Sequence, residues 1–133
     1  MKKLRILMLI VAAVVTAAIV TPASAKGKAA IKFAEDVYNF GTIPEKKGVV
    51  THEFTFTNTG DAPLVIVDAH AECGCTTPEY PKAPVMPGKT GKIKVTYNPL
   101  GRPGSFTKSV TIKSNGKPKK AVIYIKGIVN PNK

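Results

Sequence analysis

Glycine and proline interrupt this chain so often after residue 25 that long helices are excluded. The longest stretch without either residue has 13 residues, between Gly27 and Gly41, and the next longest have 11. These stretches are rich in Val, Ile, Thr, Phe and Tyr, which favour pleated strands over helices. Leucine, a strong helix former, occurs here only as Leu64 and Leu100. This part of the chain therefore predicts an all-β fold.

Apolar side chains recur at every second position along several of these stretches, as expected for strands with one buried face. Leu64 to Val67 form instead a continuous apolar run, which predicts a central strand covered on both faces. With turn residues between the stretches, the pattern predicts a sandwich of two sheets. The expected strands cover residues 31–33, 37–40, 50–57, 64–67, 92–97, 109–113 and 123–129. The expected core comprises Phe54, Phe56, Ile66, Val95, Tyr97, Val110 and Ile112.

Residues 1–25 have the parts of an export signal. Lys2, Lys3 and Arg5 give a basic start, residues 6–20 are almost all apolar, and Ala23-Ser24-Ala25 is a small-residue cleavage site. The apolar run of 15 residues is shorter than the roughly 20 that span a bilayer. We therefore predict a cleaved signal peptide over residues 1–25 and a single domain over residues 26–133, with no transmembrane segment after cleavage. The protein is expected in the periplasm or outside the cell.

The predicted mature domain is strongly basic, with 17 basic and 8 acidic side chains and a net charge of +9. Arg102 is the only arginine, whereas arginine is the usual choice for bidentate phosphate and base contacts. The sequence therefore predicts no nucleic-acid partner. Weak attraction to an anionic envelope surface is a hypothesis from charge alone. Several lysines alternate with apolar residues along the predicted strands and are expected on the solvent-facing sides of the sheets: Lys92, Lys94, Lys108, Lys113 and Lys126.

Two connections between strands carry distinctive residues. Asn58-Thr59-Gly60 is expected to form a corner, because asparagine bonds to nearby backbone and tolerates a left-handed conformation. Prolines recur at every third position of the connection over residues 71–88: Pro78, Pro81, Pro84 and Pro87. This period matches polyproline II, and nine steps of about 3.1 Å would cross from one sheet to the other. The alternative is a docking strip that displays Tyr80, Ala83 and Met86 to a partner.

Cys73-Gly74-Cys75 opens that connection and is the one constellation with reactive groups. A disulfide here would close a very small loop and stabilise little in the chain-entropy model. Three interpretations stay open: a local disulfide that fixes the turn, a redox-active dithiol, and a Cu(I) site completed by His70 or Met86. The candidate binding or redox residues are Cys73, Cys75, Tyr80 and Met86. The weaker candidates for a metal are Cys73, Cys75, His70 and Met86, and no resident cofactor is expected.

The sequence gives little support to catalysis. It contains no Ser/His/Asp grouping with suggestive spacing, no glycine-rich phosphate loop and no paired carboxylates. His52 alternates with Phe54 and Phe56 and is most simply a residue at the rim of the core. We therefore predict a protein that is not an enzyme.

An ordered set of motifs resembles a bacterial exported domain family of unknown function, whose hallmark is a Cys-Gly-Cys-Thr turn. The motifs are Val37–Ile43, Phe54–Gly60, Cys73–Thr76, Pro87-Gly88, Gly104, Ser114-Asn115 and Ile125–Gly127. That family is similar in turn to the immunoglobulin-like modules of Hydin-type proteins. The resemblance implies an immunoglobulin-like antiparallel sandwich of about seven strands, outside the cytoplasm, and supplies no activity.

Taken together, these observations predict a non-enzymatic binding or assembly module of the cell envelope. Its partner is expected to be another envelope protein, bound through an edge strand or through the loop over residues 71–88. The alternative is a periplasmic thiol-redox or Cu(I)-binding protein that uses Cys73 and Cys75.

Overall fold

The structure is a computed structural model that describes residues 27–132. The predicted signal peptide, residues 1–25, lies outside the described residues. In chain order the elements are β1 (Ile31–Phe33), β2 (Val37–Pro44), the 3-10 helix η1 (Glu45–Lys47), β3 (Val50–Asn58), β4 (Ile66–Ala71), β5 (Thr76–Glu79), β6 (Thr90–Tyr97), β7 (Gly104–Ser114) and β8 (Lys120–Asn130). None of the helical segments in residues 27–132 has the length and apolar character of a membrane span.

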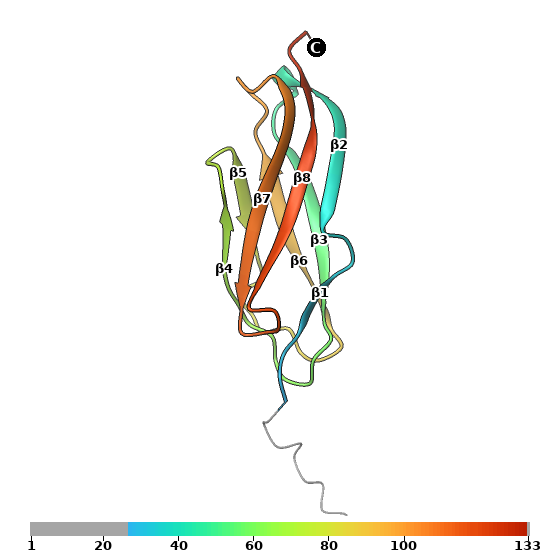
Figure 1. Ribbon diagram of the computed structural model, residues 1–133, viewed down its shortest axis with the longest axis vertical. Helices are drawn as coiled ribbons and strands as arrows, with labels where there is room; N and C mark the ends of the chain where they lie inside the picture. The colour runs from blue at the N-terminus through green and yellow to red at the C-terminus, as the bar shows by residue number, and fades with distance from the viewer. Residues whose placement is uncertain (1–26, 133) are drawn as a thin grey trace, which may run out of the picture.

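The strands form two four-stranded sheets that pack face to face (Figure 1). The first sheet has the order β1-β3-β6-β5, and the second has the order β2-β8-β7-β4. The predicted immunoglobulin-like sandwich is confirmed, with eight strands where about seven were expected. The additional strand is β5, which lies in a stretch expected to have little strand character. Pro78 within it is tolerated because β5 is an edge strand.

Antiparallel pairing was expected throughout, and this is wrong for one pair. β2 runs parallel to β8, with Val37 opposite Tyr124 and Pro44 opposite Asn130. The reason is that the chain leaves the first sheet after β1 and enters the second sheet as β2. There it runs in the same direction as β8, its neighbour in that sheet. The parallel pair is interrupted between Asn39 and Thr42, where β2 bulges.

We expected the apolar run from Leu64 to Val67 to form a central strand, and this is wrong. β4 begins at Ile66 and forms an edge of the second sheet. Leu64 and Ile66 face the core, but the side chain of Val67 is 63% exposed. The four apolar residues do not belong to one strand, because Leu64 lies before β4 and pairs with a different segment. Its backbone pairs with that of Val85 through two hydrogen bonds of 2.8 Å.

The prolines over residues 78–87 do not carry the chain between the sheets, which corrects the expected crossover. The chain returns from the second sheet to the first through the short turn over residues 72–75, since β4 and β5 are both edge strands and lie near each other (Figure 1). Residues 80–89 then connect β5 to β6 within the first sheet. A long crossover is therefore unnecessary.

The inner faces of the two sheets form one core between them. All seven residues predicted for the core are buried, and Tyr97 stacks on Phe106 with ring centroids 4.1 Å apart. His52 lies at the rim, where its ring stacks on Tyr38 at 3.5 Å. Lys108 departs from its expected place on a solvent face, because it shares the inner row of β7 with Phe106 and Val110 and is half-buried.

Asn58 holds the corner after β3, as predicted, and its side chain is completely buried. Its amide oxygen accepts from the backbone N–H groups of Ala30 and Gly60, at 3.3 and 3.0 Å. Its amide nitrogen donates to the carbonyl oxygens of Ala62 and Val85, at 2.8 and 2.9 Å. The expected left-handed backbone is absent, since only glycines among residues 27–132 have positive φ. The four hydrogen bonds join three chain segments at one point.

Candidate functional site

The Cys73–Cys75 turn lies where the chain passes from β4 to β5. The two cysteines form a disulfide, with their Cα atoms 5.2 Å apart. The side chain of Cys75 is 4% exposed and belongs to the core, whereas Cys73 is half-buried and packs against it. Residues 72–75 form a bend and a turn between the two strands, and this turn brings the two sulfurs together. The sulfurs therefore face the interior of the sandwich more than the solvent.

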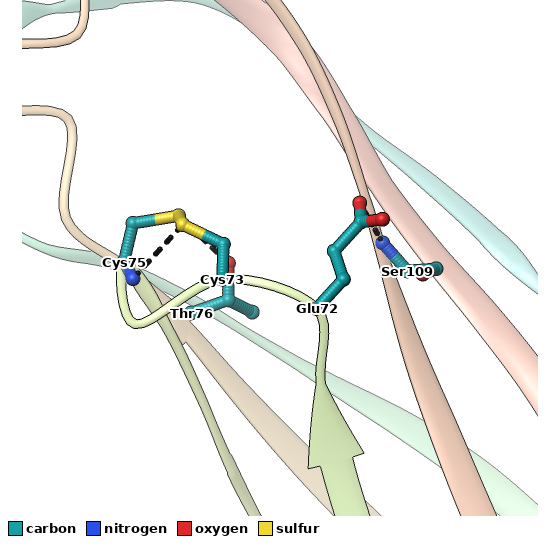
Figure 2. Close-up of a disulfide and its surroundings, with 5 residues drawn as sticks. All are labelled: Glu72, Cys73, Cys75, Thr76 and Ser109. Atoms are coloured by element: carbon teal, nitrogen blue, oxygen red, sulfur yellow. Dashed lines mark hydrogen bonds between the residues drawn. A yellow bond between two sulfur atoms is a disulfide. The ribbon is translucent and has the colours of Figure 1, made fainter.

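Hydrogen bonds fix this turn to strands of both sheets, and Figure 2 shows the contact with Ser109 of β7. Asn98, which follows β6, donates its backbone N–H to the carbonyl oxygen of Cys75 at 2.9 Å. Glu72 donates its backbone N–H to the carbonyl oxygen of Ser109 at 3.3 Å. The Glu72 carboxylate in turn accepts the N–H of Ser109 at 3.0 Å. The turn is thus tied to β7 on one side and to the end of β6 on the other.

Within the turn, the backbone folds around the sulfur of Cys73. The N–H of Cys75 donates to the Sγ atom of Cys73 at 3.1 Å, as Figure 2 shows. The N–H of Thr76 donates to the carbonyl oxygen of Cys73 at 3.2 Å. Of the three interpretations of the cysteine pair, this arrangement favours the local disulfide that fixes the turn.

The structure does not bring the other metal candidates to the sulfurs. Met86 lies beyond the Thr90 end of β6, whereas Cys75 adjoins the Tyr97 end. Seven steps of about 3.3 Å along β6 put roughly 23 Å between these two ends. His70 is exposed on β4, in register with Thr111. No group of three or more His, Cys, Asp or Glu residues within 27–132 is arranged to hold a metal ion.

Tyr80 is engaged within the molecule. Its hydroxyl donates to the carbonyl oxygen of Val67 at 3.2 Å, so it covers part of the free edge of β4. The ammonium group of Lys82 lies 3.6 Å from the centre of the tyrosine ring, a cation–π contact. Met86, by contrast, is 52% exposed. Met86 is therefore open to solvent and Tyr80 is held within the molecule, and a docking strip of Tyr80, Ala83 and Met86 stays a prediction.

The structure reveals an exposed apolar surface that the sequence analysis missed. We call it the β8 ridge and define it as Val37, Val122, Tyr124 and Ile128. Their exposed fractions are 41%, 38%, 38% and 50%, respectively. The three β8 residues stand on its outward row, and Val37 of β2 lies beside Tyr124 in register. The sequence signal for this surface is the unbroken apolar run Val122–Ile125. A strand with one solvent-facing side would alternate apolar with polar residues, and this run does not.

The outer face of the first sheet has the opposite character. Its outward residues on β3 and β6 are threonines, lysines and a glutamate. Lys92 lies 3.3 Å from Glu53, and Lys94 lies 4.0 Å from Glu79 on β5. The exposed apolar residues of the strands are therefore gathered on the second sheet.

Comparison with solved structures shows the same fold in several proteins. A protein of unknown function from Porphyromonas gingivalis W83 superposes with a TM-score of 0.65 at 13% identity, over 75% of this chain and 46% of that one. The VesB protease of Vibrio cholerae gives 0.60 at 16% identity, over 76% of this chain and 32% of that one. A PapD-like domain of human CEP192 gives 0.57 at 11% identity, over 78% of this chain and 87% of that one.

These similarities establish the fold alone, because the identities are low. The chain spans about half of the Porphyromonas protein and about a third of VesB. Among curated proteins, no sequence similar enough to count as a relative was found. The expected likeness to Hydin-type modules and the role of the Cys-Gly-Cys turn as a family hallmark stay predictions. Residues 31–129, nearly the whole described domain, match the family described as a protein of unknown function, DUF1573, and the chain belongs to that family.

Proposed function

We propose that this chain is an exported, non-enzymatic binding module that holds another protein of the cell envelope against β2 and β8. The observation that carries the proposal is the β8 ridge. Exposed apolar side chains gathered on one face of a domain are typical of interaction sites. The first sheet shows that the chain can cover an outer face with threonine and ion pairs, so the apolar side chains on β8 are not a necessity of the fold.

A comparison of the four edge strands supports the same location. β1 has 3 residues and β5 has 4, including a proline, so both offer short edges. β4 has 6 residues, but the Tyr80 hydroxyl occupies the Val67 carbonyl on its free side. β2 has 8 residues and is the longest edge among residues 27–132. It also borders the β8 ridge.

The bulge in β2 limits how much backbone pairing a partner can gain. The N–H of Gly41 is already bonded to the side-chain oxygen of Asn39, at 2.8 Å. A partner strand would therefore meet two short stretches of edge on either side of the bulge. We infer that the ridge side chains supply most of the binding energy and that the β2 edge sets the direction of the bound segment.

The expected alternative surface, the loop over residues 71–88, is less suited to a partner. Cys75 and Val85 are buried, and the Tyr80 hydroxyl bonds within the chain. A thiol-redox or Cu(I) function is not favoured either, because the two sulfurs are bonded to each other and the Cys75 sulfur is buried.

The chemistry of the ridge indicates the kind of segment that it would bind. Lys120 and Lys126 are exposed on the same row of β8 as the apolar side chains. A complementary segment would be extended, would carry apolar side chains at alternate positions, and would have acidic residues at its ends. The predicted export signal over residues 1–25 supports a partner outside the cytoplasm.

Site-specific photo-crosslinking in intact cells tests this proposal. A photoreactive phenylalanine analogue at Tyr124 should capture one discrete protein, and the same analogue at Thr55, on the outer face of the first sheet, should capture none. Adding Ile128→Lys to the Tyr124 probe should remove the product, because a charge on the ridge opposes apolar burial. Equal capture at both positions, or capture that survives Ile128→Lys, would refute the ridge as the binding surface. A product of twice the mass of the chain would identify the partner as a second copy.

The mass of the protein recovered from the envelope fraction tests export. A polypeptide that begins at Lys26 is expected after removal of residues 1–25. A full-length polypeptide confined to the cytosol would contradict the proposed location.

A further inference from the structure

Lysines from separate parts of the chain converge at one end of the sandwich, which we call the basic end. It is built from residues 27–30, 59–65 and 85–89 and from the turn between β7 and β8. The segments are joined by hydrogen bonds such as Lys117 N–H to Ala29 O and Asp61 N–H to Lys28 O, both 3.0 Å. Six exposed lysines lie there: Lys28, Lys89, Lys113, Lys117, Lys119 and Lys120.

These lysines are poorly neutralised. None of the six forms an ion pair within residues 27–132. The acidic residues at this end are Asp61, in the loop over residues 59–65, and Asp68 of β4, which lies opposite Lys113. Lys113 and Lys120 are also directly opposite each other in the β7–β8 register. Like charges in this position destabilise a sheet, so the arrangement is one that binding of an anion would relieve.

A hollow of about 460 Å³ opens among these segments. Lys28, Lys117 and Lys119 contribute to its walls, together with Asn115. Gly27, Ala29, Ala62 and Gly116 line the rest, so the hollow combines cationic groups with a small apolar surface. An anionic group with a short aliphatic part would find complementary contacts in it.

The basic end is also the place where the described chain begins, as the blue start of the trace shows (Figure 1). The apolar sequence over residues 6–20 is separated from Gly27 by six residues. Six residues of extended chain reach at most about 21 Å. Before residues 1–25 are removed, insertion of that apolar segment in a bilayer would hold the basic end close to the bilayer surface.

We propose that the basic end docks the domain on an anionic phospholipid surface. Lysine is a compact point charge that suits a diffuse layer of phosphate headgroups, whereas paired recognition of single phosphates favours arginine. The lysines come from several loops and strand ends, so their charges are spread over the whole of one end of the sandwich. This surface is independent of the β8 ridge and does not rest on the partner proposed for it.

Docking at this end would set the orientation of the domain. β7 and β8 have 11 residues each and run the length of the sandwich. The Cys73–Cys75 turn adjoins the Tyr97 end of β6, seven residues from Thr90, so at about 3.3 Å per residue it would stand roughly 23 Å from the membrane surface. The β8 ridge would then stand along the membrane normal, open to partners beside it.

Vesicle co-sedimentation tests the proposal with the polypeptide 26–133. Every core residue lies between Ala29 and Val129, so this polypeptide contains the complete sandwich. It should bind phosphatidylglycerol/phosphatidylcholine vesicles at about 0.01 M salt and be released at about 1 M, where the Debye length falls to roughly 3 Å. Vesicles of phosphatidylcholine alone should not bind it.

Matched substitutions separate the basic end from total charge. The triple variant K117Q/K119Q/K120Q should lose roughly 100-fold in its partition to the anionic vesicles. The control K46Q/K47Q/R102Q removes three exposed charges from the opposite end and should lose much less. Circular dichroism checks that both are folded, and the pair K28Q/K89Q, from other segments, should also weaken binding. Equal losses for the triple variant and its control would overturn the proposal.

Tryptophan fluorescence tests the orientation, since the chain contains no tryptophan. Thr59→Trp places a reporter at the basic end, and Leu100→Trp places one at the opposite end. Brominated lipids should quench the first and not the second. Equal quenching of both would contradict the proposed orientation.

Two further arms distinguish a lipid surface from other anions. Inorganic phosphate should release the protein no better than sodium chloride of equal ionic strength. Stronger release by phosphate would identify a site for the free anion instead. Binding to duplex DNA as tight as to the vesicles, at the same salt, would assign the surface to nucleic acid and overturn the lipid assignment.

Discussion

The two ends of the sandwich hold the sheets together by different means. At the basic end, the chain passes from β3 to β4 through a corner fixed by the buried amide of Asn58. At the opposite end, which we call the disulfide end, it passes from β4 to β5 through a turn closed by Cys73 and Cys75. The amide joins three distant segments, whereas the covalent bond joins residues that are already neighbours. We therefore expect the hydrogen bonds of Asn58 to stabilise this fold more than the disulfide does.

The ends also differ in charge. Six lysines and two aspartates occupy the basic end, whereas Glu45, Lys46, Lys47, Glu72 and Arg102 occupy the disulfide end. Both glutamates of the disulfide end accept backbone N–H groups, Glu45 from Gly101 at 3.0 Å and Glu72 from Ser109 at 3.0 Å. Charged side chains therefore complete the structure at one end and remain free for a ligand at the other.

The largest effect is expected from Asn58→Ala. The substitution leaves the N–H groups of Ala30 and Gly60 and the carbonyl oxygen of Ala62 without a partner, whereas the Val85 carbonyl keeps the N–H of Leu64. Each buried group left unsatisfied costs about 1–3 kcal/mol, so the free energy of unfolding should fall by at least about 3 kcal/mol. Urea denaturation measures the change. A loss below about 1 kcal/mol would show that water replaces the amide and that the Asn58 corner stabilises the fold no more than the disulfide does.

Glycines at the two ends provide the next comparison. A Cβ atom at Gly60 would meet the backbone of Ala30 at 2.6 Å and of Ala29 at 2.8 Å. Gly60→Ala should therefore destabilise the protein by about 1–3 kcal/mol. A Cβ atom at Gly74 would meet nothing within 4 Å, and the φ of Gly74 is not positive.

Gly74→Ala should consequently be neutral or should stabilise the protein by up to about 1 kcal/mol, because alanine restricts the unfolded chain. Thermal unfolding of the two variants side by side checks both expectations. If Gly74→Ala were the more damaging of the two, the disulfide turn would be more tightly constrained than its surroundings indicate.

Reduction of the disulfide should have a smaller effect. For a loop of three residues the chain-entropy model gives a stabilisation of roughly 1.6 kcal/mol. Urea denaturation with and without reductant should show a difference of that size, and the Cys73→Ser/Cys75→Ser variant should not respond to reductant. A difference above about 4 kcal/mol would place the disulfide above the Asn58 corner in importance.

The smallest effect concerns the pH dependence of stability at the disulfide end. Burial raises the pKa of Tyr97 above its ordinary value of 10.0, and the nearby Arg102 partly offsets this by lowering it. A tyrosine with a raised pKa favours folding while it is neutral. Its contribution is fully present below pH 10 and is lost as the pH rises toward the higher pKa of the folded state.

Unfolding free energies at about pH 9 and about pH 11 measure this loss. Tyr97→Phe should reduce the difference between the two pH values, and Tyr124→Phe on the exposed ridge is the matched control. An unchanged difference in the Tyr97 variant would assign the alkaline loss to other groups.

The sequence allowed more of the fold than of the candidate site to be predicted. Strand positions and core residues followed from local alternation, and the expected first strand has the same bounds, Ile31–Phe33, in the structure. The Asn58 corner was also predictable, because an asparagine before a Thr-Gly pair has few other uses. The candidate site was harder to predict. Cys73 and Cys75 are identifiable from their reactive side chains, whereas the β8 ridge consists of residue types that are common in any strand.

The sequence by itself determined that pleated segments separated by turns would bury alternate side chains, because alternation and turn chemistry act within a few residues. Only the tertiary structure decided that β2 lies parallel to β8, that β4 is an edge, and that Lys28 meets Lys117 and Lys119 around one hollow. These features depend on which distant segments become neighbours. Strand pairing and sheet packing select those neighbours through the whole set of inward-facing side chains, and no single segment specifies them.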